Sequence, residues 1–210
     1  MTDLQTIALY NQRAQDYQAL IISKPDKKML PPFIEACGTT AHILDFGCGT
    51  GDSAAEMSRH GLTVDAADAS SAMCEIAMQH PEVGAGMTVR RMTFEQLDAV
   101  DFYDGIWAHF SLLHITKDEL PAILGLIFTA LKDNGVFSLA VKQGDGEARD
   151  RFGRLYAYYQ DPELTAYLRQ AGFTVTTHFY GKGKGMSGKT EPWMGMFCQK
   201  TASLTDMKHD

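Results

Sequence analysis

Three glycines at alternate positions follow directly after an apolar run, and this feature constrains the fold more than any other. The run reads Ile43-Leu44-Asp45-Phe46-Gly47-Cys48-Gly49-Thr50-Gly51, and a polar pair then leads into residues typical of a helix. Glycine tolerates positive φ and lets a ligand approach the backbone closely. A helix N-terminus adds unpaired N–H donors and a positive dipole end. The pattern therefore predicts a strand, a tight turn and a helix that cradle a nucleotide in an open α/β sheet.

The spacing of the glycines separates this turn from the best-known dinucleotide fingerprint. That fingerprint reads G-x-G-x-x-G, whereas this chain has G-x-G-x-G with an acid two positions before the first glycine. In this respect the segment resembles the first motif of class I S-adenosylmethionine-dependent methyltransferases. The resemblance implies S-adenosylmethionine as cofactor, bound by Asp45, Gly47, Cys48, Gly49 and Gly51.

A second acid, Asp68, ends the next predicted strand, over residues 62–67. An acid about 20 residues past the glycine turn, at a strand tip, can accept both hydroxyls of a ribose. Residues 64–73 resemble the second motif of the family, with Asp68 in the ribose position. Asp68 could instead cap the following helix, although Ser70 or Ser71 can do so, and Asp65 is a rival acid in mid-strand. The resemblance also implies cofactor contacts from Ala69 and Met73.

The third and fourth predicted strands supply the remaining cofactor candidates. The family often has Gly-Asp-Ala beside the adenine, where this chain has Met92-Thr93-Phe94-Glu95. The Thr93 hydroxyl could accept one hydrogen bond from adenine, and Phe94 either lines the adenine slot or packs under a loop. Residues 104–114 resemble the fourth motif, whose tip lies beside the reactive methyl and would include Ala108 and Phe110. The Asn/Asp-Pro-Pro-aromatic sequence of DNA amino-methylating enzymes is missing there.

Two histidines, His109 and His114, follow the fourth predicted strand and are the candidate proton acceptors. Histidine titrates near neutral pH and is the commonest general base. We place His114 first and His109 second, while a hydrogen-bonded packing role after two leucines fits His114 as well. Their five-residue spacing does not suit a helical zinc pair, so we expect no metal.

Residues 142–159 form a long polar segment after the fifth predicted strand. Loops at the carboxyl ends of parallel strands line the ligand crevice. Arg149, the third catalytic candidate, and Arg154 could hold an acidic or aromatic acceptor, or the segment could be a solvated loop with a tyrosine-rich helix as a lid. Residues 181–190 are rich in glycine and lysine and predict a flexible hairpin loop. Trp193 beyond it walls the acceptor pocket or packs in the core.

The N-terminal residues predict a helical cap over about 1–37. Apolar and aromatic residues recur at helical spacing from Leu4 to Tyr17, and a second helix is expected near 27–36 after a break at residues 23–26. In the resembled family such a helix folds over the cofactor. We therefore expect Tyr17 to face the methionine end of the cofactor, and simple packing on the sheet is the alternative.

Strands and helices alternate through the rest of the chain, which predicts a parallel sheet with helices on both faces. Helices are expected over 52–60, 71–79, 117–131 and 161–172, and strands over 43–46, 62–67, 87–92, 104–109 and 135–141. The last two strands, 173–180 and 193–199, have no helix between them and must pair antiparallel. The predicted fold is a doubly wound, mostly parallel seven-stranded sheet with an antiparallel last strand. Residues 1–200 form one domain, and 201–210 a disordered tail.

Composition limits the partners. The chain has 210 residues, a net charge of −7 and a pI near 5.4, which disfavours nucleic acid because phosphate binding needs a basic face. We see no signal peptide and no apolar run long enough for a membrane span. Four scattered cysteines suggest reduced thiols in the cytoplasm. The oligomeric state is left open.

These observations predict a methyltransferase that acts on a small-molecule acceptor at oxygen, nitrogen or sulfur. Two alternatives stay open on the sequence alone. One is a nicotinamide-dependent oxidoreductase on a Rossmann sheet, which the glycine spacing disfavours. The other is a catalytically silent module that binds S-adenosylmethionine, because fold does not settle function.

Overall fold

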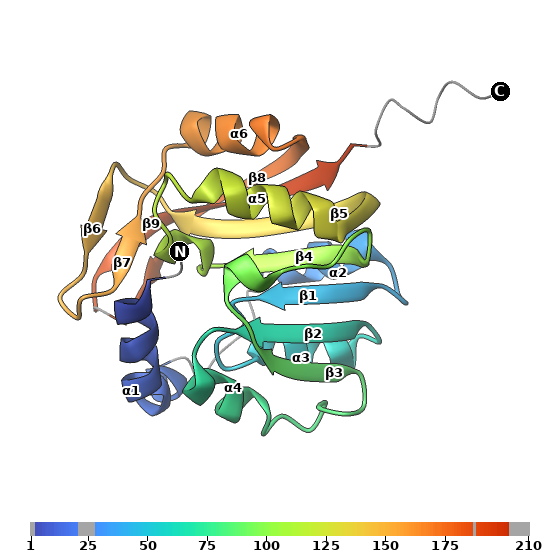
Figure 1. Ribbon diagram of the computed structural model, residues 1–210, viewed down its shortest axis with the longest axis horizontal. Helices are drawn as coiled ribbons and strands as arrows, with labels where there is room; N and C mark the ends of the chain where they lie inside the picture. Colours follow the sequence, from blue (N-terminus) through green and yellow to red (C-terminus); the bar gives the residue numbers. More distant parts are fainter. Residues whose placement is uncertain (1–2, 21–27, 187, 202–210) are drawn as a thin grey trace.

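A seven-stranded sheet in the order β3-β2-β1-β4-β5-β9-β8 forms the centre of the molecule (Figure 1). The computed structural model describes residues 3–20, 28–186 and 188–201. Strand β9 runs antiparallel to both of its neighbours, β5 and β8, and the other pairings are parallel. The predicted fold class is confirmed. The strands are β1 His42–Phe46, β2 Thr63–Asp68, β3 Met87–Arg91, β4 Tyr103–His109, β5 Leu131–Lys142, β8 Phe173–Lys184 and β9 Thr190–Lys200.

Helices cover both faces of this sheet (Figure 1). One face packs against α2 and α3, with the ring of Phe33 of α2 tilted against that of Trp107 of β4 at 5.1 Å between ring centroids. The other face packs against α5 and α6 around Phe137 and Leu139 of β5. The helices are α1 Leu4–Leu20, α2 Leu30–Cys37, α3 Asp52–Arg59, α4 Ser71–Ala77, α5 Leu120–Ala130 and α6 Asp161–Gln170, with 3₁₀ turns η1 Phe94–Gln96 and η2 Leu112–His114.

Two helices begin later than predicted. Helix α5 starts at Leu120 instead of 117, because the backbone N–H and hydroxyl of Thr116 both donate to the Glu119 carboxylate and hold a turn before the helix. Helix α2 starts at Leu30 instead of 27, with prolines in its first turn, where they are tolerated. The predicted break at residues 23–26 and the tail beyond Thr201 lie outside the described residues.

A two-stranded hairpin, β6 Glu147–Arg149 and β7 Leu155–Ala157, occupies part of the long polar segment 142–159. The alternative of a tyrosine-rich helix as a lid there is wrong. The two strands pair over only three residues each, which is too short for an alternating apolar pattern to stand out in a charged segment. The hairpin stands at the carboxyl ends of the parallel strands, on the same side as α1 (Figure 1).

Helix α1 lies across the carboxyl ends of the parallel strands, between α4 and the β6–β7 hairpin (Figure 1). Ala14 packs with Met73 and Ile76 of α4 in a small separate apolar cluster. The backbone leaves helical geometry at Arg13, where φ is −121°. The helix thus forms a roof over the edge at which α/β sheets bind their ligands.

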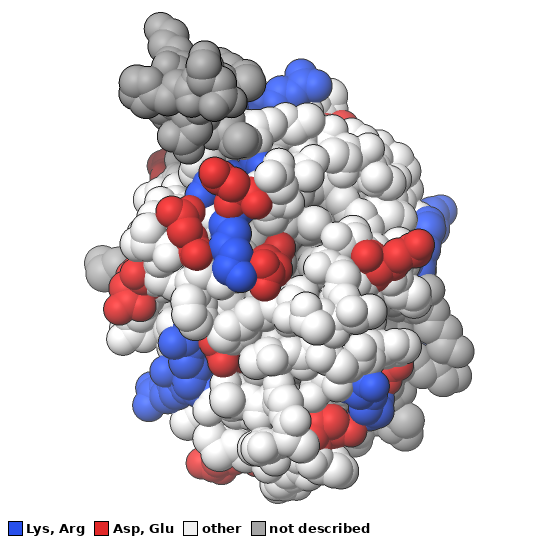
Figure 2. Space-filling model, turned by 90° about the vertical axis from the view of Figure 1, so that its right-hand side faces the viewer, with Lys and Arg blue, Asp and Glu red and all other residues white. Residues whose placement is uncertain are grey.

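The opposite edge, at the amino ends of the strands, has a mixed surface. Figure 2 shows acidic and basic side chains next to one another there, with no continuous basic area among the described residues. Within residues 3–20, 28–186 and 188–201, no helix is both long enough and apolar enough to cross a bilayer.

Candidate functional site

The turn between β1 and α3 can be built only with glycine at two of its positions. Gly47 has φ +86°, and a Cβ on it would lie 2.2 Å from the Cβ of Ser111. Gly51, the N-cap of α3, has φ +83°, and a Cβ would lie 2.9 Å from that of Ala77 in α4. Gly49 faces open space below the ring of Tyr17, whose nearest carbon is 3.8 Å from the hypothetical Cβ. The turn is therefore packed on two sides and open on the third.

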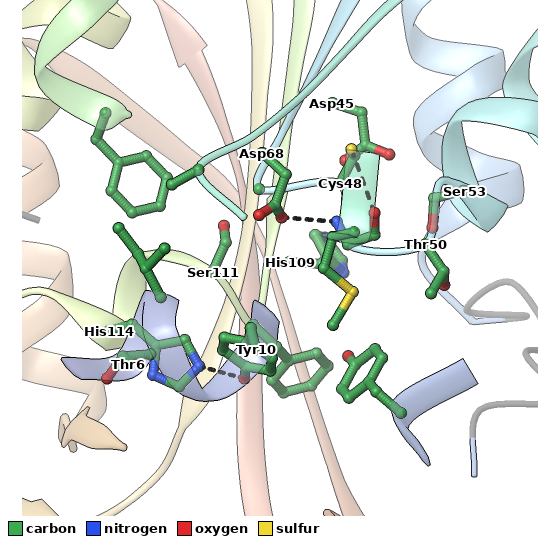
Figure 3. Close-up of a pocket in the computed structure, with 18 of the residues that line it drawn as sticks. Thr6, Tyr10, Asp45, Cys48, Thr50, Ser53, Asp68, His109, Ser111 and His114 are labelled. Carbon is green, nitrogen blue, oxygen red and sulfur yellow. Dashed lines mark hydrogen bonds between the residues drawn. The ribbon is translucent and has the colours of Figure 1, made fainter. Parts of the chain in front are cut away.

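Asp68 at the tip of β2 holds this turn in place. Its Oδ2 accepts the N–H of Gly49 at 2.9 Å, and its Oδ1 accepts the N–H of Ser70 at 2.8 Å (Figure 3). Burial raises the pKa of Asp68. Ser70 itself caps α4 by accepting the N–H of Met73 at 3.2 Å. Asp68 is therefore not needed as the helix cap and can present its remaining lone pairs to a ligand.

A cavity of about 350 Å³, here called the inner cavity, opens between the glycine turn, the tip of β4 and α1. Four carboxylates and no lysine or arginine occur among the described residues that line it. The carboxylates are Asp3, Asp45, Asp52 and Asp68. An acidic, partly enclosed cavity attracts a ligand that carries positive charge.

Asp45 is the least compensated of these acids. Its side chain is buried, and its Oδ2 has no hydrogen-bond partner among the described residues. Burial, aided by the nearby Asp68, raises the pKa of Asp45 to about 8, although the Ala54 N–H opposes the shift. A buried carboxyl without a cation prefers its neutral form. An ammonium group placed in the inner cavity would supply the missing partner.

His114 is hydrogen-bonded to Tyr10 (Figure 3), and Tyr10 in turn is bonded to the buried Arg154. The carbonyl of Leu155 can only accept, so the His114 Nδ1 at 2.6 Å carries the proton and Nε2 is the acceptor. The Tyr10 hydroxyl then donates to Nε2 at 2.8 Å and accepts from Arg154 Nη1 at 3.0 Å. The pKa of His114 is lowered to about 4, mainly by burial and also by the nearby Arg154 and Lys142, while the hydrogen bond to the Leu155 carbonyl opposes the shift.

His109 sits deeper, beside the glycine turn. Its ring stacks on that of Trp107 at 3.3 Å between centroids, and its Nε2 lies 2.8 Å from the hydroxyl of Ser138. Burial lowers the pKa of His109 well below its ordinary value. Both histidines therefore line the inner cavity as neutral groups at physiological pH.

Helix α1 is fastened over the cavity from two directions. On one side the Asn11 side-chain oxygen accepts from the Ser70 hydroxyl at 2.7 Å and from the Ala72 N–H at 3.2 Å. On the other side Arg149 of β6 makes two hydrogen bonds of 2.9 Å to Asp3, and the pKa of Asp3 falls to about 2 mainly because of this pairing. These contacts keep Tyr10 and Tyr17 over the cavity.

A second and larger space, here called the outer cavity, has a volume of about 1060 Å³ and joins the inner cavity under α1. The two share Tyr10, Tyr17, Phe110 and His114 as lining residues. Phe110 has φ +54°, a conformation rare for a bulky residue and enriched at functional sites. The junction between the two cavities is where a bound cofactor and a second substrate would meet.

Comparison with known proteins agrees with this geometry. The family model described as a methyltransferase domain matches residues 43–135, which include the glycine turn, Asp68 and β4. By this match residues 43–135 are similar to a methyltransferase domain, in keeping with the resemblance of the glycine turn and Asp68 to class I S-adenosylmethionine-dependent methyltransferases. The chain is 28% identical over 149 residues to the O-methyltransferase resE of Aspergillus sclerotiorum, a match that covers 64% of this chain and 55% of that protein. The chain therefore spans about half the length of this curated relative.

Solved structures share the fold of this chain. An S-adenosylmethionine-dependent methyltransferase from Methanosarcina mazei has a TM-score of 0.73 at 17% identity, over 82% of this chain and 98% of that one. The 1,6-didemethyltoxoflavin-N1-methyltransferase of Burkholderia thailandensis has a TM-score of 0.71 at 23% identity, over 93% and 88%. At these identities the likeness concerns the fold alone.

Most of the residues predicted to bind the cofactor line the inner cavity. They are Tyr17, Asp45, Gly47, Cys48, Gly49, Asp68, Ala69, Met73, Phe94 and Phe110. Three predicted residues do not line it. Gly51 packs against α4, Thr93 begins η1 by donating its N–H to the Gln96 side chain, and Ala108 is buried inside β4.

The three catalytic candidates are separated by the fold. His114 and His109 line the inner cavity, whereas Arg149 lines neither cavity because it is engaged with Asp3 at the surface. The arginine that reaches the junction is Arg154, which is buried and bonded to Tyr10. The cofactor and catalytic roles of these residues stay predictions.

Sequence reasoning missed several lining residues, which are Thr6, Thr50, Ser53, Met92, Trp107 and Ser111. Only Thr50 and Ser53 carried a signal, because they belong to the glycine turn and the first turn of α3. Ser111 lines the cavity because it packs against Gly47, and its hydroxyl donates to the Phe46 carbonyl at 2.7 Å. That contact joins positions 65 residues apart, which no local pattern reports.

Proposed function

We propose that the protein transfers a methyl group from S-adenosylmethionine to a small-molecule acceptor. The observation that carries this proposal is the inner cavity, which joins a glycine turn to four carboxylates, the strand-tip Asp68 among them, with no lysine or arginine in its described lining. S-adenosylmethionine carries a sulfonium and an ammonium group, and both positive charges suit such a cavity. The match of residues 43–135 to a methyltransferase domain supports the same function.

The residues present fit the cofactor. Asp68 would hold the ribose hydroxyls from the tip of β2, and the orphaned Asp45 carboxylate would hold the ammonium group. Phe94 and Met73 would enclose the adenine between η1 and α4. Tyr17, whose ring lies over Gly49, would cover the methionine end of the ligand.

S-adenosylmethionine, when bound, supplies a methyl group that is already activated by the sulfonium. The protein's part is to align the acceptor, exclude water and, for a protonated acceptor, remove a proton. Tyr10 stands at the junction of the cavities and its hydroxyl already points its proton at His114 Nε2. We assign this pair as a relay, in which Tyr10 takes the acceptor's proton as its own proton passes to His114.

The acceptor belongs to the small molecules, and its site is the outer cavity. The O-methyltransferase name of the curated relative and the toxoflavin precursor of the structural relative favour this class. We further propose that residues 1–200 act as one domain with a cap over 1–37, that no nucleic acid or membrane is a partner, and that the four free cysteines belong to a cytoplasmic protein.

Two experiments test the function. Calorimetry should show binding of S-adenosylhomocysteine and none of NAD or NADP, because the glycine spacing disfavours a dinucleotide. Transfer of label from methyl-labelled S-adenosylmethionine across a panel of phenols, amines and thiols should then identify an acceptor. Binding of NAD without binding of S-adenosylhomocysteine would reject the proposal. Binding without transfer to any acceptor would favour a silent module.

Replacing Asp68 by alanine is expected to weaken S-adenosylhomocysteine binding by about 1.5–3 kcal/mol, or roughly 10- to 150-fold, because hydrogen bonds to a charged acceptor are lost. Calorimetry on the folded variant measures the loss. Asp98→Ala, an exposed acid outside both cavities, is the control and should bind like the parent. Unchanged affinity in Asp68→Ala would remove Asp68 from the ribose site.

The affinity for S-adenosylhomocysteine is expected to rise with pH between 6 and 8 and then level off. Asp45, with a pKa of about 8 in the free protein, must lose its proton to pair with the ammonium group. The complex then binds fewer protons than the free protein, so each pH unit below 8 lowers affinity by up to about tenfold.

Calorimetry at three pH values checks this dependence. Asp45→Asn removes the titrating carboxyl and leaves the neighbouring Asp68 and Asp52 in place, so its affinity should be weaker and nearly independent of pH. An equal slope in the variant and the parent would show that another group releases the proton.

A further inference from the structure

The outer cavity differs from the inner cavity in charge. Five lysines and arginines line it against two acids, whereas the whole chain carries a net charge of −7. The cations are Arg13, Lys142, Arg151, Arg154 and Lys184, and the acids are Asp16 and Glu191. The charge of the lining residues thus changes sign at Tyr10, from carboxylates around the inner cavity to mostly cations around the outer cavity.

Three of these cations are already neutralised by nearby carboxylates. Arg13 pairs with Asp16 at 2.9 Å and Lys142 with Glu191 at 2.5 Å. Arg154 pairs with Asp150 at 2.7 Å. The pairs of Lys142 and Arg154 are buried or half-buried and that of Arg13 is exposed, and in each case the partner carboxylate leaves little net charge for a ligand.

The other two cations, Arg151 and Lys184, have no carboxylate within ion-pair distance in the described parts of the chain. Both are exposed at the rim, one on the β6–β7 hairpin and the other at the end of β8. Two uncompensated positive charges at one mouth raise the local concentration of anions. The charge that a substrate meets in the outer cavity is therefore positive.

The walls of the outer cavity are aromatic. Phe110 and Trp193 meet edge to face at 6.0 Å, and Tyr156 carries the Lys142 ammonium 3.7 Å from its ring centroid. Phe152 faces the guanidinium of Arg13 at 4.6 Å. Flat side chains at right angles bind planar ring systems by face and edge contacts. The aromatic walls of the outer cavity therefore favour a planar ring, and its two rim cations favour a ligand with negative charge.

We propose that the outer cavity binds planar aromatic acceptors that bear an anionic group, and that Arg151 and Lys184 select that charge at the rim. The ring lies between Phe110, Trp193 and Phe152, with the atom to be methylated at the Tyr10 junction. The anionic group points away from the junction, toward the two rim cations. This inference rests on the proposed methyl transfer, because it names the substrate class of the same site.

Equilibrium dialysis with 2-naphthoate and its neutral counterpart 2-naphthamide tests the proposal. In protein saturated with S-adenosylhomocysteine, naphthoate should bind at least about tenfold more tightly than naphthamide. In the double variant R151Q/K184Q the ratio should fall below about threefold, with naphthamide affinity unchanged. Because the rim is exposed, about 0.5 M KCl should also reduce the ratio in the parent protein.

A charge-matched double variant provides the control. Lys182 and Arg169 are exposed cations that line neither cavity, so K182Q/R169Q should keep the parent ratio. Equal binding of the two probes to the parent, or an unchanged ratio in R151Q/K184Q, would overturn the proposal. Calorimetry with S-adenosylhomocysteine on the same samples tests the proposed methyl transfer separately from the anion preference. If S-adenosylhomocysteine does not bind, methyl transfer is rejected, and the ratio of naphthoate to naphthamide binding can still be measured.

Discussion

Replacing His114 by alanine is expected to lower turnover by about 100-fold or more while cofactor affinity stays nearly unchanged. General-base assistance contributes about 10²–10⁴-fold, and His114 is the only partner in the described structure that accepts the proton of the Tyr10 hydroxyl. The proton on its Nδ1 is held by the Leu155 carbonyl, so the imidazole cannot adopt the other tautomer without losing a 2.6 Å hydrogen bond. The measurement is the turnover number on an acceptor with a protonated nucleophile.

Tyr10→Phe and the double variant make this test specific. Both residues belong to one relay, so Tyr10→Phe should lose a similar factor, and the double variant should lose little more than either single one. His114 has a pKa of about 4 and is active as the neutral base, so turnover should be flat above about pH 5 and fall below it. His60→Ala, an exposed histidine on α3's C-cap, should behave like the parent. A His114→Ala variant within a few-fold of the parent would make His114 a packing residue.

Arg154→Met is expected to lower the free energy of unfolding by about 3–5 kcal/mol, because it removes one partner of a buried ion pair and leaves the other uncompensated. The side chains of Arg154 and Asp150 are only 3% and 9% exposed. Arg154 also supports the Tyr10 hydroxyl, which loses a donor in the variant. Urea unfolding of the purified protein measures the loss.

Arg149→Met is the matched comparison for this stability prediction. Arg149 lies five positions earlier and also forms an ion pair, but its side chain is 42% exposed, and exposed pairs contribute about 0–1 kcal/mol. Adding Asp150→Asn to Arg154→Met should recover part of the loss, since the amide carries no stranded charge and can still accept the N–H of Phe152. A loss below about 1 kcal/mol in Arg154→Met would show that water reaches Asp150.

The cofactor side of the site could be predicted because its determinants are local in sequence. The strand, glycine turn and helix around Gly47 are consecutive, and Asp68 ends the next strand, so periodicity and turn chemistry were sufficient. The fold class followed from the same alternation, including the reversed β9. The predicted starts of α2 and α5 were about three residues too early. Prolines in the first turn set the start of α2 at Leu30, and the Thr116–Glu119 hydrogen bonds set the start of α5 at Leu120.

The acceptor side could not be predicted because its determinants are contacts between distant segments. Tyr10 and His114 are 104 positions apart, and Tyr10 and Arg154 are 144 apart. Arg149 and Arg154 look equivalent in a charged stretch, and only burial distinguishes the one that reaches the junction from the one tied to Asp3. No pattern within one element carries that information.

The place of β9 in the sheet has a consequence for synthesis on the ribosome. This strand is the last in the chain, yet it lies inside the sheet between β5 and β8. The glycine turn follows β1 and Asp68 ends β2, and both strands are complete long before β9 emerges, whereas β5 keeps an unpaired edge until then. A nascent or truncated chain lacking residues 190–200 would therefore have the cofactor half of its site but no Trp193 wall and an exposed strand edge. Such a chain is expected to bind cofactor weakly and to aggregate before it could bind an acceptor.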